Sequence, residues 1–116
     1  MNSPMRGDVF RANLNPSEGS EQGGDSRPVL VVSRDALNAY SPVVIVVPCT
    51  DASNKKRLYP SHVPVVAGSG GLTLDSVFLC EQIRTISKTR LVKHMGKVDR
   101  SVMTKIAAAL KIVLDL

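Results

Sequence analysis

The stretch Gly19-Ser20-Glu21-Gln22-Gly23-Gly24-Asp25-Ser26-Arg27-Pro28-Val29-Leu30-Val31-Val32 joins a flexible polar segment to a buried-strand pattern. Its glycines permit positive φ, so several backbone N–H groups can turn toward one point and suit an anionic oxygen. Arg27 stands at the junction and adds a permanent charge with a planar fork of donors. The stretch therefore predicts a phosphate-holding loop on a rigid strand. The plain alternative is a glycine-rich surface loop with a solvated arginine.

The bulk composition predicts one soluble globular domain over residues 1–116. Apolar residues make up 43% and charged residues 22%, and no apolar run approaches the roughly 20 residues that cross a bilayer. The N-terminus lacks the apolar core of a signal peptide. Two cysteines, Cys49 and Cys80, lie in apolar surroundings typical of a reduced cytoplasmic protein, although the sequence alone leaves a disulfide open. The net charge of +5 favours a polyanionic or acidic partner.

Short apolar or alternating runs separated by turn residues fill most of the chain, and they predict a mainly β fold. We expect strands at residues 6–14, 29–33, 43–48, 62–66, 74–80 and 82–86, with residues 91–98 either a last strand or a loop. Pro64 marks residues 62–66 as an edge strand. Asp99 is a good N-cap for a C-terminal amphipathic helix. Strands followed by one helix favour a small curved sheet or barrel with the helix packed on it.

Two side chains remain as candidates for catalysis once other kinds of site are considered. His62 and His94 are isolated from each other and from the cysteines, so the spacing predicts no structural metal. The carboxylates share no motif, and no Gly-x-Ser-x-Gly elbow occurs. Arg27 stands at the start of one predicted strand and Thr50 at the end of another. If these strands are antiparallel neighbours, a cation and a hydroxyl meet beside the glycine loop, which outlines a phosphodiester site.

A series of motifs then occurs in one order along nearly the whole chain. They are Arg6-Gly7-Asp8-Val9, Gly19-Ser20-Glu21-Gln22-Gly23-Gly24, Arg27-Pro28-Val29-Leu30-Val31, Tyr40-Ser41-Pro42, Pro48-Cys49-Thr50, Asp75-Ser76-Val77 and Glu81-Gln82-Ile83-Arg84-Thr85-Ile86. With these motifs the chain resembles the MazF/PemK family of bacterial toxins. One departure is that Asp25-Ser26 separates Gly24 from Arg27 where the family pattern has a single residue, which lengthens the loop.

The resemblance implies a fold that is mainly β with α, namely a small SH3-like β-barrel like that of MazF and the gyrase poison CcdB. A C-terminal helix and a homodimer belong to the same expectation. It implies the toxin of a type II toxin–antitoxin system, a sequence-specific endoribonuclease that cuts single-stranded mRNA without a metal ion or cofactor. The implied products are a 2′,3′-cyclic phosphate and a 5′-hydroxyl, and the effect is arrest of translation and growth. The implied regulator is an acidic, MazE-like antitoxin that covers the RNA groove.

The family's catalytic arginine and threonine fall on Arg27 and Thr50. Its RNA-contacting positions fall on Ser20, Glu21, Gln22 and Gln82. Charge adds four candidate phosphate contacts, which are Lys55, Lys56, Arg57 and Arg84. A solvated surface loop is the alternative for the first three of these. No base for the 2′-hydroxyl is identified, although Glu21 is a candidate by its chemistry.

Two other classes of function stay open at this point. One is a gyrase-directed poison of the same fold, and the other is a non-catalytic barrel that binds nucleic acid or protein. The presence of both Arg27 and Thr50 favours the ribonuclease. Incubation of the purified protein with mixed-sequence RNA in EDTA distinguishes between these three functions, because only a metal-independent ribonuclease leaves discrete cuts.

Overall fold

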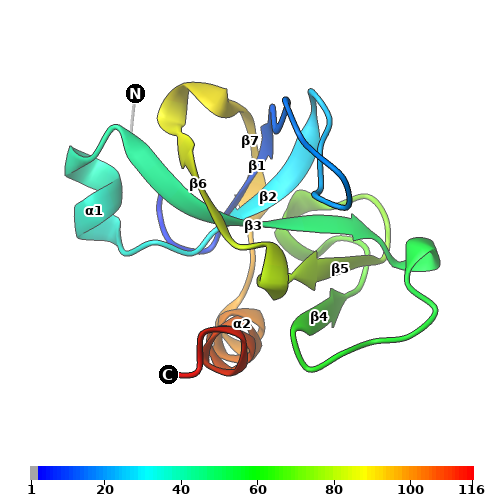
Figure 1. The fold of residues 1–116 in the computed structure, drawn as a ribbon. Coiled ribbons are helices and arrows are strands. Elements are labelled where there is room, and N and C mark those ends of the chain that lie inside the picture. The colour runs from blue at the N-terminus through cyan, green and yellow to red at the C-terminus, as the bar shows by residue number, and fades with distance from the viewer. Residues whose placement is uncertain (1–2) are drawn as a thin grey trace.

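A curved antiparallel sheet with a C-terminal helix beneath it makes up the fold (Figure 1). The computed structural model describes residues 3–116. Its strands are β1 (Asp8–Ala12), β2 (Arg27–Val31), β3 (Val43–Asp51), β4 (His62–Val65), β5 (Ser76–Leu79), β6 (Arg84–Ser87) and β7 (Leu91–Lys97). The α-helices are α1 (Asp35–Tyr40) and α2 (Arg100–Leu114). Short 3-10 turns are η1 (Ala52–Asn54), η2 (Ser69–Gly71), η3 (Cys80–Gln82) and η4 (Lys88–Arg90).

Strand β3 is the hub of the sheet. Its run of β-branched residues favours an extended backbone, and the strand continues past Pro48 to Asp51. It pairs with β6 along Val43–Val46, with β2 along Val46–Pro48 and with β5 along Cys49–Asp51. The strand order β4-β5-β3-β2-β1-β7, with β6 beside β3, therefore bends the sheet around this one strand.

The two faces of the sheet bury two separate apolar clusters, because successive side chains of a strand point to opposite faces. Val9, Leu30 and Val47 belong to the cluster on which α2 packs, together with the buried Ile106 and Ala109 of that helix. The other cluster contains alternate residues of the same strands, one residue from the chain that follows β1 and one from β6. Its members are Ala12, Leu14, Val29, Val31, Val44, Val46 and Ile86. Strand β2 is buried on both faces, as its continuous apolar run predicts.

The ends of the elements depart in places from the sequence-based expectation. Residues 91–98 were open between strand and loop, and Leu91–Lys97 of this stretch form β7 by pairing with β1. The predicted strands at 74–80 and 82–86 are shorter, because the turn η3 lies between β5 and β6. Strand β4 is an edge strand, as predicted from Pro64. Asp99 caps α2 by accepting a hydrogen bond from the Val102 N–H at 2.9 Å, also as predicted.

The structure also shows the state of the cysteines and the character of the helices. Cys49 and Cys80 are both buried and unpaired, so the disulfide that the sequence left open is not formed. Within residues 3–116, neither α2 nor any other helix has the length and apolar character that a membrane crossing requires.

Candidate active site

The register of β2 with β3 brings the two predicted catalytic residues together. Val29 lies opposite Pro48 and Leu30 opposite Val47 in an antiparallel ladder. Extended two residues further toward the start of β2, this register would bring Arg27 level with Thr50. Both residues line one cavity of about 360 Å³ near the end of β3. The expectation that their strands are antiparallel neighbours is therefore confirmed.

Arg27 keeps unused hydrogen-bonding capacity in this cavity. Its Nη2 donates to Oε1 of Gln22 at 2.9 Å. Its Nε is buried, and among residues 3–116 it is the buried side-chain nitrogen that lacks any hydrogen-bond partner. Unpaired buried donors are rare in folded proteins because each costs the full desolvation of a polar group. The guanidinium is therefore suited to an acceptor with negative charge.

The Thr50 hydroxyl is oriented by the turn that follows β3. Asp51 accepts a hydrogen bond from the Ser53 N–H at 2.9 Å and so begins η1. Within that turn, Asn54 Nδ2 donates to Thr50 Oγ1 at 3.0 Å. Because the oxygen already accepts this bond, the hydroxyl hydrogen is available as a donor. Thr50 is only 5% exposed, which keeps the hydroxyl in a fixed place.

The glycine loop lies against β2 and the η3 turn. Gln22 N–H donates to Gln82 Oε1 at 2.6 Å, and Gln82 Nε2 donates to the Ser20 carbonyl at 3.2 Å. The base of the loop is closed by a 2.8 Å bond from the Leu14 N–H to the Gly24 carbonyl. A second cavity of about 490 Å³ is lined by five of the predicted RNA-contacting residues, namely Ser20, Glu21, Gln22, Gln82 and Arg84.

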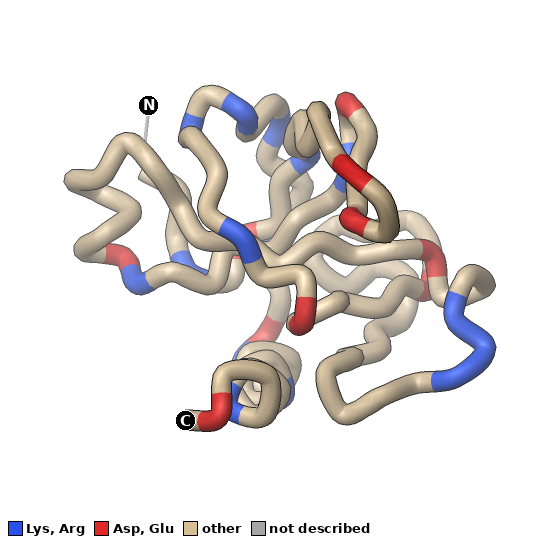
Figure 2. The backbone as a smooth tube through the Cα atoms, viewed as in Figure 1, with Lys and Arg blue, Asp and Glu red and all other residues tan. Residues whose placement is uncertain are grey.

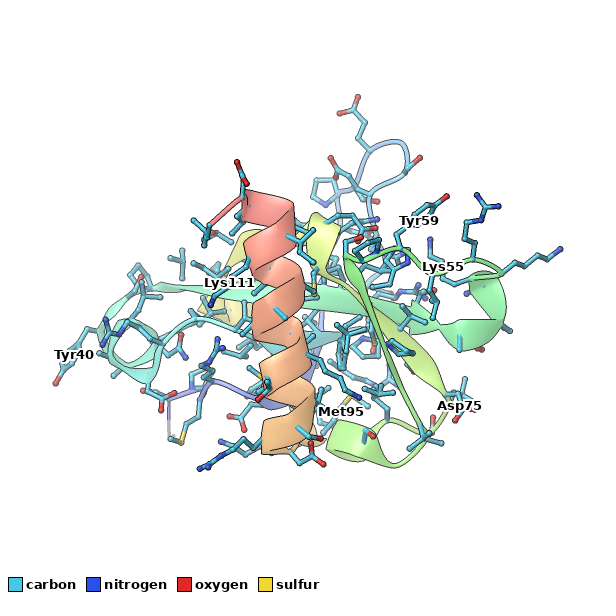
Figure 3. All side chains as sticks on the ribbon, turned by 90° about the horizontal axis from the view of Figure 1, so that it is seen from below. Tyr40, Lys55, Tyr59, Asp75, Met95 and Lys111 are labelled. Carbon is cyan, nitrogen blue, oxygen red and sulfur yellow. The ribbon has the colours of Figure 1, made fainter. Side chains whose placement is uncertain are left out.

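The four basic candidates do not lie together. Arg84 lines the second cavity, and its Nη1 points at the Leu14 carbonyl, 3.4 Å away. Lys55, Lys56 and Arg57 lie between η1 and β4 and line neither of the two cavities. Their loop is the blue segment at the far right of the tube in Figure 2, and Figure 3 shows Lys55 on the opposite side of the molecule from Tyr40.

Arg11 is a cavity residue that the sequence analysis missed. It lies in β1 opposite Pro28, lines the first cavity and donates from Nη1 to the Ser26 carbonyl at 3.2 Å. The available signal was an arginine inside an otherwise largely apolar strand. That signal can be interpreted only when the register of β1 with β2 is known. The register cannot be predicted from the sequence, because a long polar loop connects the two strands. The first cavity is thus lined by two arginines.

Cys49 also lines the first cavity, but its thiol is chemically quiet. Burial raises the pKa of the Cys49 thiol to about 12. The nearby positive charges of Arg27 and Arg11 lower the pKa, but by less than burial raises it. The group is therefore a neutral thiol at neutral pH and a poor nucleophile. In the part of the chain from residue 3 onward, no group of three or more His, Cys, Asp or Glu side chains is arranged to hold a metal ion.

Comparison with known proteins identifies the family. A model of the PemK-like, MazF-like toxins of type II toxin–antitoxin systems matches residues 5–114. The chain belongs to this family. This MazF-like toxin is 46% identical over 111 residues to endoribonuclease MazF of Staphylococcus epidermidis, with coverage of 96% of this chain and 91% of the relative. It is 48% identical to endoribonuclease EndoA of Bacillus subtilis, with coverage of 96% and 94%.

Solved structures agree with this assignment. The crystal structure of MazF from Deinococcus radiodurans superposes with a TM-score of 0.84 at 26% identity and covers 100% of both chains. An endoribonuclease from a mycobacterial species, solved in complex with its cognate antitoxin, has a TM-score of 0.80 at 29% identity, covering 98% of this chain and 97% of that one. The family resemblance and the MazF-like fold predicted from the motifs are therefore confirmed.

Gly24→Ala should lower RNA cleavage by this MazF-like toxin about tenfold or more. Gly24 has a φ of +120°, and an added Cβ would lie 2.8 Å from both Cγ and Cδ of Arg27. The arginine side chain must move to relieve that collision, and displacement of a reacting group costs up to about 10² in rate. Cleavage of a mixed-sequence RNA, followed on gels, measures the effect.

Gly19→Ala is the matched control for this experiment. Gly19 also has positive φ, +58°, but an added Cβ there meets nothing within 4 Å. The control therefore places an alanine at a left-handed position of the same loop without the collision. Equal loss of cleavage in both variants would show that loop strain, and not the position of Arg27, limits the reaction.

Cys49→Ala should leave the rate of cleavage within about threefold of the parent, because a thiol with a pKa of about 12 neither attacks nor transfers a proton at neutral pH. Single-turnover cleavage at neutral pH tests this, with circular dichroism to establish that the variant is folded. A loss of 10² or more in a folded variant would make the thiol part of the reaction.

Proposed function

We propose that this MazF-like endoribonuclease cuts single-stranded mRNA at a specific sequence, without a metal ion, and leaves 2′,3′-cyclic phosphate and 5′-hydroxyl ends. The observation that carries the proposal is that Arg27 and Thr50, from the neighbouring strands β2 and β3, line one cavity. The names of the Staphylococcus epidermidis and Bacillus subtilis relatives, both endoribonucleases, support the same activity. The cellular effect is arrest of translation and growth in the cytoplasm.

Arg27 and Thr50 act on the charge that develops at phosphorus. In this reaction the 2′-hydroxyl oxygen attacks the adjacent phosphorus, and the bond from phosphorus to the 5′-oxygen breaks. Negative charge grows on the phosphoryl oxygens, where preorganised donors stabilise the transition state. Arg27 supplies a cationic fork of donors, and Thr50 supplies its free hydroxyl hydrogen. Arg27 does not act as the base, because guanidinium stays protonated in proteins.

The carboxylates near the glycine loop do not meet these two residues. Glu21 and Glu81 line the second cavity, whereas Arg27 and Thr50 line the first. Glu21 accepts a bond from the Glu18 N–H at 3.2 Å, and Glu81 is held by His62 at 3.1 Å. Burial raises the pKa of Glu81, but hydrogen bonds from its own backbone, His62 and Ser61 outweigh this and lower it overall. We assign the base for the 2′-hydroxyl to neither.

We further propose that the toxin forms a homodimer and binds an acidic, MazE-like antitoxin. The net charge of +5 suits both an RNA and an acidic polypeptide. Strands β4 and β7 end the sheet, and a second copy can cover such an edge. The mycobacterial relative was solved with its cognate antitoxin, and the Deinococcus radiodurans proteins were solved as MazE–MazF. Competition between antitoxin and RNA for the same cavities would inhibit cleavage by occlusion.

Arg27→Ala should lower cleavage by about 10²–10³-fold, as expected for loss of a preorganised donor at a developing oxyanion. Thr50→Ala should lower it less, and Thr50→Ser should restore much of the rate because it keeps the hydroxyl. The assay uses mixed-sequence RNA in EDTA, with the cut ends sequenced. Arg34→Ala, at an exposed arginine before α1, is the control and should cut like the parent.

Unchanged cleavage by a folded Arg27→Ala protein would overturn the assignment of Arg27. A parent protein that leaves RNA intact but blocks DNA supercoiling by gyrase would overturn the ribonuclease activity in favour of the gyrase poison. A parent that binds RNA and leaves it uncut would favour the non-catalytic barrel.

The salt dependence of RNA binding should identify which cations meet phosphates. Each phosphate neutralised on a single strand contributes about −0.7 to the log–log slope of affinity against salt. We expect Arg11→Ala, and the double variant Lys55→Ala with Lys56→Ala, to flatten this slope and to weaken all sequences alike, since phosphate contacts position without specifying. Lys105→Ala on the exposed face of α2 is the control. An unchanged slope for the Lys55–Lys56 variant would make that loop merely solvated.

A further inference from the structure

The chain has two glutamines, Gln22 and Gln82, and the structure bonds one to the other. Gln82 uses both ends of its side-chain amide on the glycine loop. Its Oε1 accepts from the Gln22 N–H at 2.6 Å, and its Nε2 donates to the Ser20 carbonyl at 3.2 Å. The two backbone groups flank Glu21, so one planar amide fixes the loop on both sides of that residue. Free rotation of the loop at this point would break both bonds.

The turn that carries Gln82 is itself firmly held. Cys80 at the start of η3 is fully buried, and its carbonyl accepts from the Ile83 N–H at 3.2 Å. Glu81 bonds to Nε2 of His62 at 3.1 Å, and the His62 side chain is 3% exposed. Because His62 Nδ1 accepts from the Tyr59 N–H at 3.1 Å, Nε2 carries the proton and donates it to Glu81. Gln82 therefore projects from a rigid turn toward a glycine-rich loop.

The fixed loop in turn holds the arginine. With its backbone bonded to Gln82, Gln22 presents its side-chain Oε1 to Arg27 Nη2 at 2.9 Å. This bond has a charged donor, and such bonds are stronger than neutral ones. An unbroken series of contacts thus runs from η3 through the loop to the guanidinium. It leaves the remaining guanidinium donors, including the unpaired Nε, for a ligand.

We propose that Gln82 is a positioning residue that fixes Gln22, and through Gln22 the guanidinium of Arg27, in the geometry needed for RNA cleavage. The proposal rests on the function proposed for Arg27. It differs from the sequence-based expectation that Gln82 contacts RNA, because both ends of the Gln82 amide are already bonded to the loop. Catalysis requires such a support, because the guanidinium of Arg27 lies beside a flexible glycine-rich loop.

The first measurement follows amide hydrogen exchange of residues 20–22 in the free protein and needs no activity. Gln82→Ala removes both bonds, so exchange of the Gln22 N–H should become about tenfold faster, as expected for loss of one hydrogen bond. Gln82→Glu keeps an acceptor for that N–H and loses the donor to Ser20, so the Gln22 amide should stay protected. Thr85→Ala, at an exposed neighbour on β6, is the control. Unchanged exchange in Gln82→Ala would overturn the proposal.

The second measurement separates positioning from direct RNA contact. Gln82→Ala should lower kcat by about 10–100-fold, in line with the cost of a displaced reacting group, with KM changed less than threefold and the cut sequence unchanged. Gln22→Ala should lower kcat similarly, and the double variant should be no slower than Gln22→Ala alone, because both act through one contact.

Three results would contradict the proposal. Additive losses in the double variant, or a changed recognition sequence with raised KM, would make Gln82 an RNA contact. Faster cleavage by Gln22→Ala would show that Gln22 blocks Arg27. If the parent protein cuts no RNA, the proposed function fails, while the exchange measurement still decides whether Gln82 fixes the loop.

Discussion

The antiparallel register of β2 with β3 is the constraint on which the molecule depends. A shift of that register by one residue would turn every side chain of β2 to the opposite face of the sheet. Val29 and Val31 would leave their cluster, and Arg27 would no longer face the end of β3. The burial of two apolar faces therefore enforces the geometry of the cavity. Stability and chemistry use the same hydrogen-bonded ladder.

Thr50 and Arg27 are each held by a residue of another element. Asp51 shapes the turn that brings Asn54 to Thr50, and the loop that reaches Arg27 is bonded to η3. Side-chain amides make these contacts at short and at long sequence separation, from Asn54 to Thr50 and from Gln82 to the loop. An arrangement of this kind keeps a small site ordered without a large apolar core, because one or two hydrogen bonds are enough to hold each residue in place.

Local patterns predicted much of this fold, and long-range contacts account for the rest. The β-branched run of β3, the continuous apolar run of β2 and the Asp99 cap are local signals, and each was readable. Strand β7 could not be told from a loop, because its exposed residues become a strand only through pairing with β1. Arg11 and the bonds of Gln82 were missed for the same reason. The amide of Gln82 and the N–H of Gln22 are 60 positions apart, and no local pattern reports such a contact.

The burial of Cys49 has a consequence for how the cavity responds to oxidants. With a pKa of about 12, on the order of one Cys49 side chain in 10⁵ is a thiolate at pH 7. Peroxides react with the thiolate, and Cys49 is 2% exposed. Cys80, with its pKa also raised to about 12, is protected in the same way. A cysteine sulfur thus borders the cavity without the thiolate character of a redox-sensing cysteine.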